Sequence, residues 1–572
     1  MDKKWVIERG DVIDKRLALN PVIQRIMNAR GVSSFEEASE FISMKPQVTH
    51  NPFLMKDMEE AVELILSGAD MGKKICVYGD YDTDGVTSVS LLVEILKYIS
   101  DNVMYYLPSR FEEGYGLNIS AVDKIYDMGA DIIVTVDCGS VSVNEVSYAK
   151  SLGIEIIVSD HHALSDEKPP CPVINPKQED CTYPFKELCG CGVAFKIAQA
   201  IQRKAGLPKT VLVNCLDLVA IATIGDIVPL CGENRTLIKY GLPVIRGGRR
   251  KGLAEMIERT GINLGEINSE QLAYLVVPHI NAAGRMDDAG FCVELLLSTD
   301  MDKINEYVDK LIEKNTLRKK IQEETFDRCC EIVEHKHLND RFLLIYADDA
   351  HEGVTGIVAG KLKEKYSRPA AIVTRGKEGI FKGTARSIEN INIHMLLKKY
   401  ERLFEKFGGH AGACGFSIKE DNIDELRNGL NESLNNEIKD DSGMFMRVIK
   451  IDGEVSPKDF NLKFCDDIDK LEPFGYQNEK PVFLVRNGYI LNYNYIGEEA
   501  KHVRFSLDFP GLTSVNCILF QRAGEYEGII HKGIRVDVVG YIEKNKFNGN
   551  VNIQIKVIDI KRAGEFTKER VE

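Results

Sequence analysis

Long apolar runs are missing from this sequence: none reaches the roughly 18 residues needed to cross a bilayer. The first residues, MDKKWVIERGD, contain no apolar stretch of the kind found in signal peptides. The 14 cysteines show no paired spacing, and several, such as Cys76, Cys215 and Cys292, lie inside apolar segments. This pattern is typical of reduced thiols rather than of a disulfide framework. We therefore expect a cytoplasmic protein with no membrane segment.

A zinc-binding cysteine cluster is also poorly supported. Cys189 and Cys191 have Cys171 and Cys181 upstream, but C-x-C is not the spacing that structural zinc sites usually have. We therefore expect these four cysteines to be free thiols rather than zinc ligands.

An excess of positive charge is absent as well. The chain has 73 Lys and Arg against 87 Asp and Glu, a net charge of −14. This excludes a generally basic coat for nucleic acid, but not a narrow basic groove, because steering depends on the local field. With 572 residues the chain is too long for one hydrophobic core, so we expect several domains.

Short apolar strands alternate with helices in the first half of the chain. Residues 1–45 look helical and polar, with a helical hairpin ending near Phe41. After them, strands are predicted at Lys74–Gly79, Asp131–Val136 and Ile154–Ser159, separated by helical patterns such as Val86–Ser100 and Asn144–Leu152. Helices of this length between strands predict a parallel sheet covered on both faces. We assign this α/β domain to residues 46–300.

The second half is predicted to contain a long helix and a smaller α/β domain. Residues 301–336 lack Gly and Pro, and Ile304, Val308, Leu311 and Ile312 form an apolar stripe at helical spacing. This indicates a linking helix with one docked face. Residues 337–444 contain two predicted strands and a helix between them, at Phe342–Ala347, Pro369–Thr374 and Val354–Tyr366.

Residues 445–562 are predicted to be rich in strands, followed by a tail at 563–572. Apolar and polar residues alternate here over several short stretches, and Asn548-Gly549 supplies a turn between two of them. Such a pattern predicts a small β-barrel.

Acidic residues follow each of the three early strands. The first runs into Asp80, Asp82 and Asp84, the second into Asp137, and the third into Asp160-His161-His162. In an extended chain alternate residues share one face, so we expect the first three carboxylates to project together. Active sites of open α/β sheets lie beyond the carboxyl ends of the strands. These side chains, and Asp226 after a later apolar segment, are therefore expected in one crevice.

Carboxylates gathered in this way repel one another unless cations neutralise them. Carboxylates with one or two histidines suit Mn²⁺ or Mg²⁺, and paired ions favour phosphoryl chemistry. The alternative for any single residue, such as Asp137, is a helix cap. A dinucleotide-binding fold is the rival topology, but DYDTDG stands where its GxGxxG fingerprint would be.

The acidic motifs resemble those of the DHH phosphoesterase superfamily, in order and spacing. They are GDYDTDG at 79–85, VDCG at 136–139, SDHH at 159–162 and Asp226. Other segments narrow the resemblance to the RecJ-like single-strand DNA exonucleases and extend it over nearly the whole chain. These are PSRFEEGYGL (108–117), GVAFK (192–196), Asn234-Arg235, NAAGR (281–285), HEGVTGIVA (351–359), GTARS (383–387), GGHAGACGFS (408–417) and PFGYQNEKPVF (473–483). The resemblance implies a DHH domain, a DHHA1-type second domain and an OB-fold-like barrel.

The same resemblance implies roles for the acidic residues. The metal ligands would be Asp82, Asp84, Asp137, His161 and Asp226, holding Mn²⁺ or Mg²⁺, with two ions in each site and Asp137 as the bridge. Asp80, Asp160 and His162 would complete the catalytic centre. Asp160 would orient the histidines, and His162 would face the scissile phosphate.

Substrate contacts are implied in the same way. The candidates are Arg110, Asn281, Arg285, Arg386, Gly408, Gly409 and His410. Guanidinium groups match phosphate oxygens, and the glycines allow the backbone to approach a strand closely. Phe474, Tyr476, Phe483 and Tyr489 could stack on bases, although most aromatics of the barrel are expected in its core. One departure from the family pattern is His279, where an arginine is usual.

The resemblance therefore implies a metal-dependent exonuclease that releases 5′-mononucleotides from a 5′ end of single-stranded DNA, in repair and recombination. We expect a monomer whose partners are single-stranded DNA and, in addition, a single-strand binding protein. One alternative is a phosphodiesterase for short oligonucleotides or cyclic dinucleotides. Another is a catalytically inactive, Cdc45-like replication scaffold.

Overall fold

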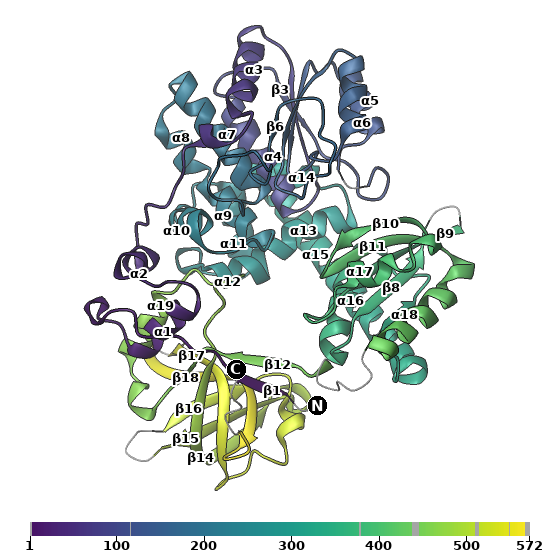
Figure 1. Cartoon of the computed structure of the whole chain (residues 1–572). Coiled ribbons are helices and arrows are strands. Elements are labelled where there is room, and N and C mark those ends of the chain that lie inside the picture. Colours follow the sequence, from purple (N-terminus) through teal and green to yellow (C-terminus); the bar gives the residue numbers. More distant parts are fainter. Residues whose placement is uncertain are drawn as a thin grey trace. The chain divides into compact units, whose positions relative to one another are not determined.

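The computed structural model describes residues 3–114, 116–376, 379–437, 445–509, 514–547 and 549–566. The chain forms two compact units. One consists of Met1–Lys4, Pro278–Ala289 and Asn305–Val448, and the other of Trp5–Val277, Gly290–Ile304 and Ile449–Glu572. Figure 1 shows the elements of both units. No helix in the described part of the chain is long and apolar enough to span a membrane.

The first residues form a strand, which the sequence analysis predicted wrongly as part of a helical segment. Strand β1 (Lys4–Ile7) pairs with β12 (Val448–Ile451). Trp5 is buried with Ile449 and Ile451, and its indole Nε1 donates to Asp559 Oδ2 across 2.7 Å. A partner more than 400 residues away decides the conformation here, so no local pattern revealed it. The predicted helical hairpin exists, as α1 (Pro21–Ala29) and α2 (Phe35–Ile42).

A parallel sheet forms the core of the first α/β domain, as predicted. Its strand order is β3-β2-β4-β5-β6, and the neighbouring strands pair in parallel. The strands are β2 (Ile75–Gly79), β3 (Val103–Tyr106), β4 (Ile132–Val136), β5 (Glu155–Ser159) and β6 (Val173–Ile174). The helices that join them are α4 (Thr83–Leu96), α5 (Ile119–Asp127) and α6 (Val143–Ser151), and α3 (Met58–Asp70) precedes β2. The carboxyl ends of β2, β4 and β5 therefore lie side by side at one edge of the sheet.

Helices follow the sheet and enclose α4. The set comprises α7 (Gly190–Ala205), α8 (Lys209–Asn214), α9 (Leu216–Gly225), α10 (Gly232–Arg246), α11 (Lys251–Arg259), α12 (Ser269–Gln271), the π-helix η4 (Leu272–Val276), α13 (Val277–Met286) and α14 (Gly290–Leu297). Helix α4 packs against α7, α9 and α14 as well as β2, and nearly all of its residues are buried. Its apolar residues are not confined to one face because it has packing partners on several sides.

The predicted linking helix is α15 (Met301–Ile332), which continues as a π-helix to His337. Ile304, Val308 and Leu311 of its predicted stripe are fully buried. The smaller α/β domain after it has a mixed sheet with the order β10-β11-β9-β8-β7. Its elements are β7 (Leu343–Tyr346), α16 (Glu352–Tyr366), β8 (Ala370–Arg375), β9 (Ile380–Arg386), α17 (Ile393–Lys398), β10 (Phe404–His410), β11 (Ala413–Lys419) and α18 (Ile423–Glu437).

The C-terminal strands close into the predicted barrel. Their order is β13-β14-β15-β16-β18-β17, and β14 also pairs with β17. The elements are β13 (Gly453–Glu454), α19 (Leu462–Asp469), β14 (Phe483–Ile496), β15 (His502–Asp508), β16 (Val515–Leu519), β17 (Arg535–Phe547) and β18 (Asn550–Arg562). Asn548 of the predicted turn lies outside the described residues, whereas Gly549 has a positive φ of 77° that suits a turn.

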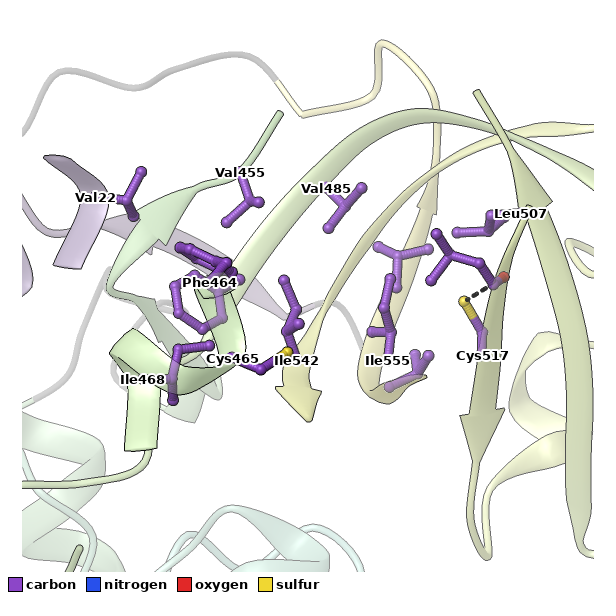
Figure 2. Packing of buried hydrophobic residues seen from close by; sticks show 14 of the residues in the cluster. Val22, Val455, Phe464, Cys465, Ile468, Val485, Leu507, Cys517, Ile542 and Ile555 are labelled. Carbon is purple, nitrogen blue, oxygen red and sulfur yellow. Dashed lines mark hydrogen bonds between the residues drawn. The ribbon is translucent and has the colours of Figure 1, made fainter. Parts of the chain in front are cut away.

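The barrel core extends into the helices beside it. Figure 2 shows Val22 of α1 and Phe464 of α19 facing the same interior as Val485 and Ile555 of the strands. Phe464 meets Phe483 edge to face, with ring centroids 5.4 Å apart. Four aromatic residues were considered for base stacking. Phe474 and Phe483 are buried in the barrel core, whereas Tyr476 and Tyr489 are exposed.

Candidate active site

The loop after β2 turns into a helix at once. Asp82 is the N-cap of α4, and its Oδ1 accepts hydrogen bonds from the backbone N–H groups of Asp84 and Gly85 at 2.9 and 3.1 Å. The expected extended chain is therefore not observed, because Asp84 already lies in the first helical turn, but the charge of Asp82 still acts on both Asp80 and Asp84. A Cβ at Gly85 would stand 2.2 Å from the Asp80 carbonyl oxygen, so only glycine fits this turn.

Asp84 is held by the first residues of α7. The backbone N–H of Gly190 donates to Asp84 Oδ2 across 2.6 Å, and that of Cys191 donates to Oδ1 across 2.8 Å. A Cβ at Gly190 would lie 2.6 Å from the Cβ of Asp137. The sequence pattern did not predict this contact. The pair of glycines at 190 and 192 could have indicated it, since glycine lowers helix propensity and leaves room for a close approach.

Asp137 follows β4 in a left-handed conformation, with φ of 61°. It does not cap a helix, since α6 begins only at Val143 with Ser142 as its cap residue, so the alternative interpretation as a helix cap is wrong. Its Oδ1 is buried and has no hydrogen-bond partner among the described residues. The same atom lies 3.1 Å from His161 Nε2 and 4.0 Å from His162 Nδ1. Asp137 thus presents an unused acceptor to both histidines.

Asp160 is satisfied by its neighbours, in contrast to Asp137. Its Oδ1 accepts from the backbone N–H groups of His161 and His162 and lies 2.8 Å from His162 Nδ1, while Oδ2 accepts from the Ser140 N–H at 2.9 Å. Asn175, another residue that the sequence analysis missed, donates to the His162 carbonyl at 3.0 Å. Asp160 therefore has the contacts of a side chain that orients the histidines.

Asp226 follows helix α9 rather than a strand, and its carboxylate lies beside the residues that follow the strands. Its Oδ2 lies 3.5 Å from His161 Nε2, and Asp84 Oδ2 lies 3.7 Å from the same nitrogen. Among the described residues, Asp84, His161 and Asp226 form one group of converging ligand atoms, and Asp137, His161 and His162 form another. Asp82 and Asp80 lie beside these groups but outside them.

Four of the clustered aspartates have raised pKa values because they are buried next to one another. Burial and the charge of Asp84 raise the pKa of Asp137 well above its usual range, and burial and Asp82 do the same for Asp80. Burial and neighbouring aspartates raise the pKa of Asp84 to about 7 and that of Asp226 to about 8. A buried group of carboxylates that disfavours its own ionisation is the arrangement that divalent ions stabilise.

The two histidines are pushed in opposite directions. Burial, followed by the charge of His162, lowers the pKa of His161 to about 3, so its imidazole is neutral. Burial also opposes the charge of His162, but the hydrogen bond and the charge of Asp160 outweigh it and raise that pKa. Both ring nitrogens of His161 are buried, and Nε2 lies 3.1 to 3.7 Å from carboxylate oxygens of Asp137, Asp226 and Asp84. A neutral imidazole, carboxylate oxygens and unused buried acceptors are a donor set that fits Mn²⁺ or Mg²⁺.

Arg110 lies next to this cluster. Its guanidinium carbon is 5.2 Å from the ring centroid of Tyr81, the residue between Asp80 and Asp82. The loop that carries it is held by Glu113, which accepts from the Ser109 N–H at 2.7 Å and from Tyr106 Oη at 2.8 Å.

The remaining candidate substrate residues belong to the other unit. Arg285 on α13 donates to the Gly353 carbonyl at 2.9 Å, and Asn281 precedes it by one helical turn. Arg386 at the end of β9 lies against Gly356, in the same helix as Gly353. Strand pairing places Ala413 opposite both Arg386 and His410. Arg285 and Arg386 thus lie at the first turns of α16, and His410 lies two strands away from Arg386, with β11 between them.

The glycines before His410 lie in strand β10. Gly409 has φ of 141° and faces Cys414, whose Cα would be 2.7 Å from an added Cβ. Gly408 has open space around it, since a Cβ there would meet no atom of the described residues within 4 Å. His279, the departure from the family pattern, is largely buried on α13 and two residues from Asn281.

Three family models match the chain. They are the DHH family N-terminal domain at residues 74–223, the DHHA1 domain at 339–436 and the RecJ OB domain at 451–559. The three matches agree with the parallel sheet, the mixed sheet and the barrel described above.

Similarity to whole proteins extends over all three domains. The single-stranded-DNA-specific exonuclease RecJ of Bacillus subtilis is 35% identical over 97% of this chain and 70% of its own length. RecJ of Haemophilus influenzae is 32% identical over 97% of this chain and 98% of its own length. Among solved structures, Thermus thermophilus RecJ with Mn²⁺ matches 98% of this chain and 79% of its own, at 26% identity and a TM-score of 0.83, and its Mg²⁺ complex matches with 0.78. The chain therefore belongs to the RecJ family of single-stranded-DNA-specific exonucleases.

Proposed function

We propose that this chain is a divalent-metal-dependent exonuclease that hydrolyses the phosphodiester bonds of single-stranded DNA from a 5′ end and releases 5′-mononucleotides. The observation that carries the proposal is the cluster at the carboxyl ends of β2, β4 and β5, where the buried acceptor Asp137 Oδ1 has no donor among the described residues. Relatives named as single-stranded-DNA-specific exonucleases, and a relative solved with Mn²⁺ and with Mg²⁺, support the substrate and the metal.

We assign the ions to Asp82, Asp84, Asp137, His161 and Asp226, with Asp80 beside them. Two ions are proposed because two groups of converging ligand atoms share His161, one with Asp84 and Asp226 and the other with Asp137 and His162. When bound, such ions supply a water of lowered pKa and stabilise the negative charge that develops on the phosphate and on the leaving oxygen. The paired ions would also relieve the repulsion that raises the pKa values of these aspartates.

The protein groups around the ions have separate tasks. His161 remains neutral and offers a nitrogen lone pair, whereas Asp160 fixes the ring of His162 and favours its protonated form. A protonated, half-exposed His162 can stabilise the phosphate or protonate the leaving oxygen. Arg110 would bind a phosphate near Tyr81, and Asn281, Arg285, Arg386, Gly408, Gly409 and His410 are proposed as further contacts to DNA.

The two alternatives are less well supported. A phosphodiesterase for short oligonucleotides or cyclic dinucleotides does not need the barrel that matches the RecJ OB domain. A scaffold of the Cdc45 type has no need for a full set of ligands, and this chain keeps them all.

We further propose a cytoplasmic monomer that cooperates with a single-strand binding protein, which a pull-down with that protein would test.

The polarity can be tested with purified protein and Mn²⁺. A single-stranded oligonucleotide with a free 5′ end should be degraded to mononucleotides, and one whose 5′ end is blocked should persist. Equal degradation of both would contradict the proposed polarity. Hydrolysis of a dinucleotide in preference to a long strand would favour the short-oligonucleotide alternative.

A further inference from the structure

An exposed tyrosine lies on the loop between α19 and β14 of the barrel, and this loop contacts the catalytic domain. In this loop Phe474 is buried in the barrel core, and Gly475 lies so close to Leu230 that an added Cβ would stand 2.6 Å from its Cδ1. Tyr476 follows, and its side chain is 49% exposed although its carbonyl accepts from the Leu230 N–H at 2.8 Å. The backbone is therefore docked on the catalytic domain, while the ring faces solvent.

The loop is held in one conformation by its own hydrogen bonds. Gly475 and Asn478 exchange backbone hydrogen bonds of 3.0 Å in both directions. The Asn478 side chain donates to the carbonyls of Leu471 and Pro473 at 2.9 and 2.8 Å, and accepts from Arg30 Nη1 at 2.7 Å. A surface aromatic on a turn fixed in this way loses little conformational freedom when it binds a partner.

Asn234 and Arg235, a pair noted in the sequence but not used by the proposed mechanism, tie this loop to the catalytic centre. Arg235 is buried and donates to the Glu472 carbonyl at 2.7 Å. Asn234 donates to the carbonyls of Pro229 at 3.0 Å and Glu187 at 2.5 Å. Glu187 stands three residues before Gly190, whose N–H binds Asp84. Adjacent side chains of α10 thus reach the tyrosine loop on one side and the segment that holds a catalytic carboxylate on the other.

The distance between the two sites is short. Leu230, which contacts the loop, is four residues after Asp226, and four residues span at most about 14 Å. A base at Tyr476 would therefore belong to one of the first few nucleotides next to the scissile phosphate. Isolated exposed tyrosines are common on protein surfaces, but Tyr476 combines exposure, a fixed backbone and a short path to the centre.

We propose that Tyr476 is a base-stacking subsite for the DNA strand, held at a fixed separation from the catalytic centre by Asn234 and Arg235. This rests on the proposed function and adds a residue that positions the substrate. Aromatic rings bind single strands by stacking without sequence preference. The subsite would favour substrates long enough to reach it, and so would contribute to the choice between long strands and dinucleotides.

The test combines Tyr476→Ala with substrates of different length. The ratio of kcat/KM for a long oligonucleotide to that for a dinucleotide should fall about tenfold in the variant, since stacking on one base has roughly that effect. Tyr476→Phe keeps an aromatic ring and should restore the ratio. Tyr98→Ala is the matched control, because Tyr98 is 51% exposed and lies just beyond the end of α4 opposite to Asp84. An unchanged ratio in Tyr476→Ala, or an equal fall in Tyr98→Ala, would overturn the proposal.

A scan with single abasic nucleotides gives a second measurement, and its first part needs only the unmodified protein. In the unmodified protein, an abasic nucleotide at one position near the 5′ end should weaken binding, measured by fluorescence anisotropy without metal. That position effect should vanish in Tyr476→Ala, and its persistence there would overturn the proposal. A protein that binds in this way but hydrolyses nothing would support the subsite and contradict the nuclease, so the two failures are distinguishable.

Discussion

Gly190 and Asp84 are separated by 106 residues, yet the backbone N–H of Gly190 donates to the Asp84 carboxylate across 2.6 Å. The same glycine leaves room for Asp137, whose Cβ would be 2.6 Å from any side-chain carbon placed there. One residue without a side chain therefore lets two of the clustered carboxylates approach each other, and this contact is the basis of the first prediction.

Gly190→Ala should reduce nuclease activity at least 100-fold and weaken Mn²⁺ binding, because Asp137 or α7 must move to accept the methyl group. Activity on a labelled single strand and calorimetric titration with Mn²⁺ would measure this. Gly360→Ala is the control, since Gly360 lies inside α16 with no atom of the described residues within 4 Å of an added Cβ. Equal activities for the two variants would show that the close approach of Gly190 to Asp137 is unimportant.

Asp160→Asn should lower activity about 10- to 100-fold, because the amide lacks the negative charge that favours protonated His162 and turns its NH2 toward donors such as the Ser140 N–H. Steady-state rates with Mn²⁺ would measure the loss. Asp166→Asn, the same exchange at an exposed position a few residues further on, should leave the rates unchanged. A fully active Asp160→Asn variant would remove Asp160 from the account.

The stability of the metal-free protein should fall as pH rises from 6 to 9. The pKa values of Asp84 and Asp226 are raised to about 7 and about 8. A carboxyl group whose pKa is raised on folding contributes stability that is complete below its unfolded value of about 4 and is lost as pH rises through the folded value. Thermal unfolding in EDTA across this range would measure the fall.

Mn²⁺ should stabilise the protein more at the upper end of that range, where the carboxylates are ionised and repel one another. Asp226→Asn should reduce the pH dependence in EDTA, because one of the groups with a raised pKa is gone. A metal-free protein whose stability is constant or rises between pH 6 and 9 would contradict the electrostatic description of the cluster.

Trp5→Phe should destabilise the protein by about 1–3 kcal/mol, since buried Asp559 loses the indole donor. Urea unfolding followed by circular dichroism would measure the free energy of unfolding. Trp5→Ala should cost more, about 3–5 kcal/mol, because the ring is also removed from its cluster. A Trp5→Phe variant as stable as the unmodified protein would show that the first strand is not integrated into the barrel.

Much of the site could be predicted from the sequence because its residues follow buried strands, and parallel strands bring their carboxyl ends to one edge. Asp137 and the Asp160-His161-His162 triplet were placed in this way. Asp226 was found only as an acidic residue after an apolar segment, and that segment proved to be a helix.

The parts that could not be predicted depend on long-range contacts. The chain from Asp80 to Asp84 turns into α4 because Asp82 caps that helix and because Gly85 has no side chain to clash with the Asp80 carbonyl. The sequence analysis assumed an extended strand here, and that assumption gave the wrong conformation. The role of Gly190 and the strand at Trp5 both require partners more than 100 residues away. Patterns of propensity do not carry that information.

The most direct test of the central claim is a paired measurement on the unmodified protein and Asp137→Ala, with Mn²⁺ titrated calorimetrically and a 3′-labelled single strand as substrate. The account predicts that the unmodified protein binds the metal and shortens the strand from its 5′ end, and that Asp137→Ala loses both activities while remaining folded. An Asp137→Ala variant that still degrades the strand at the original rate would contradict it.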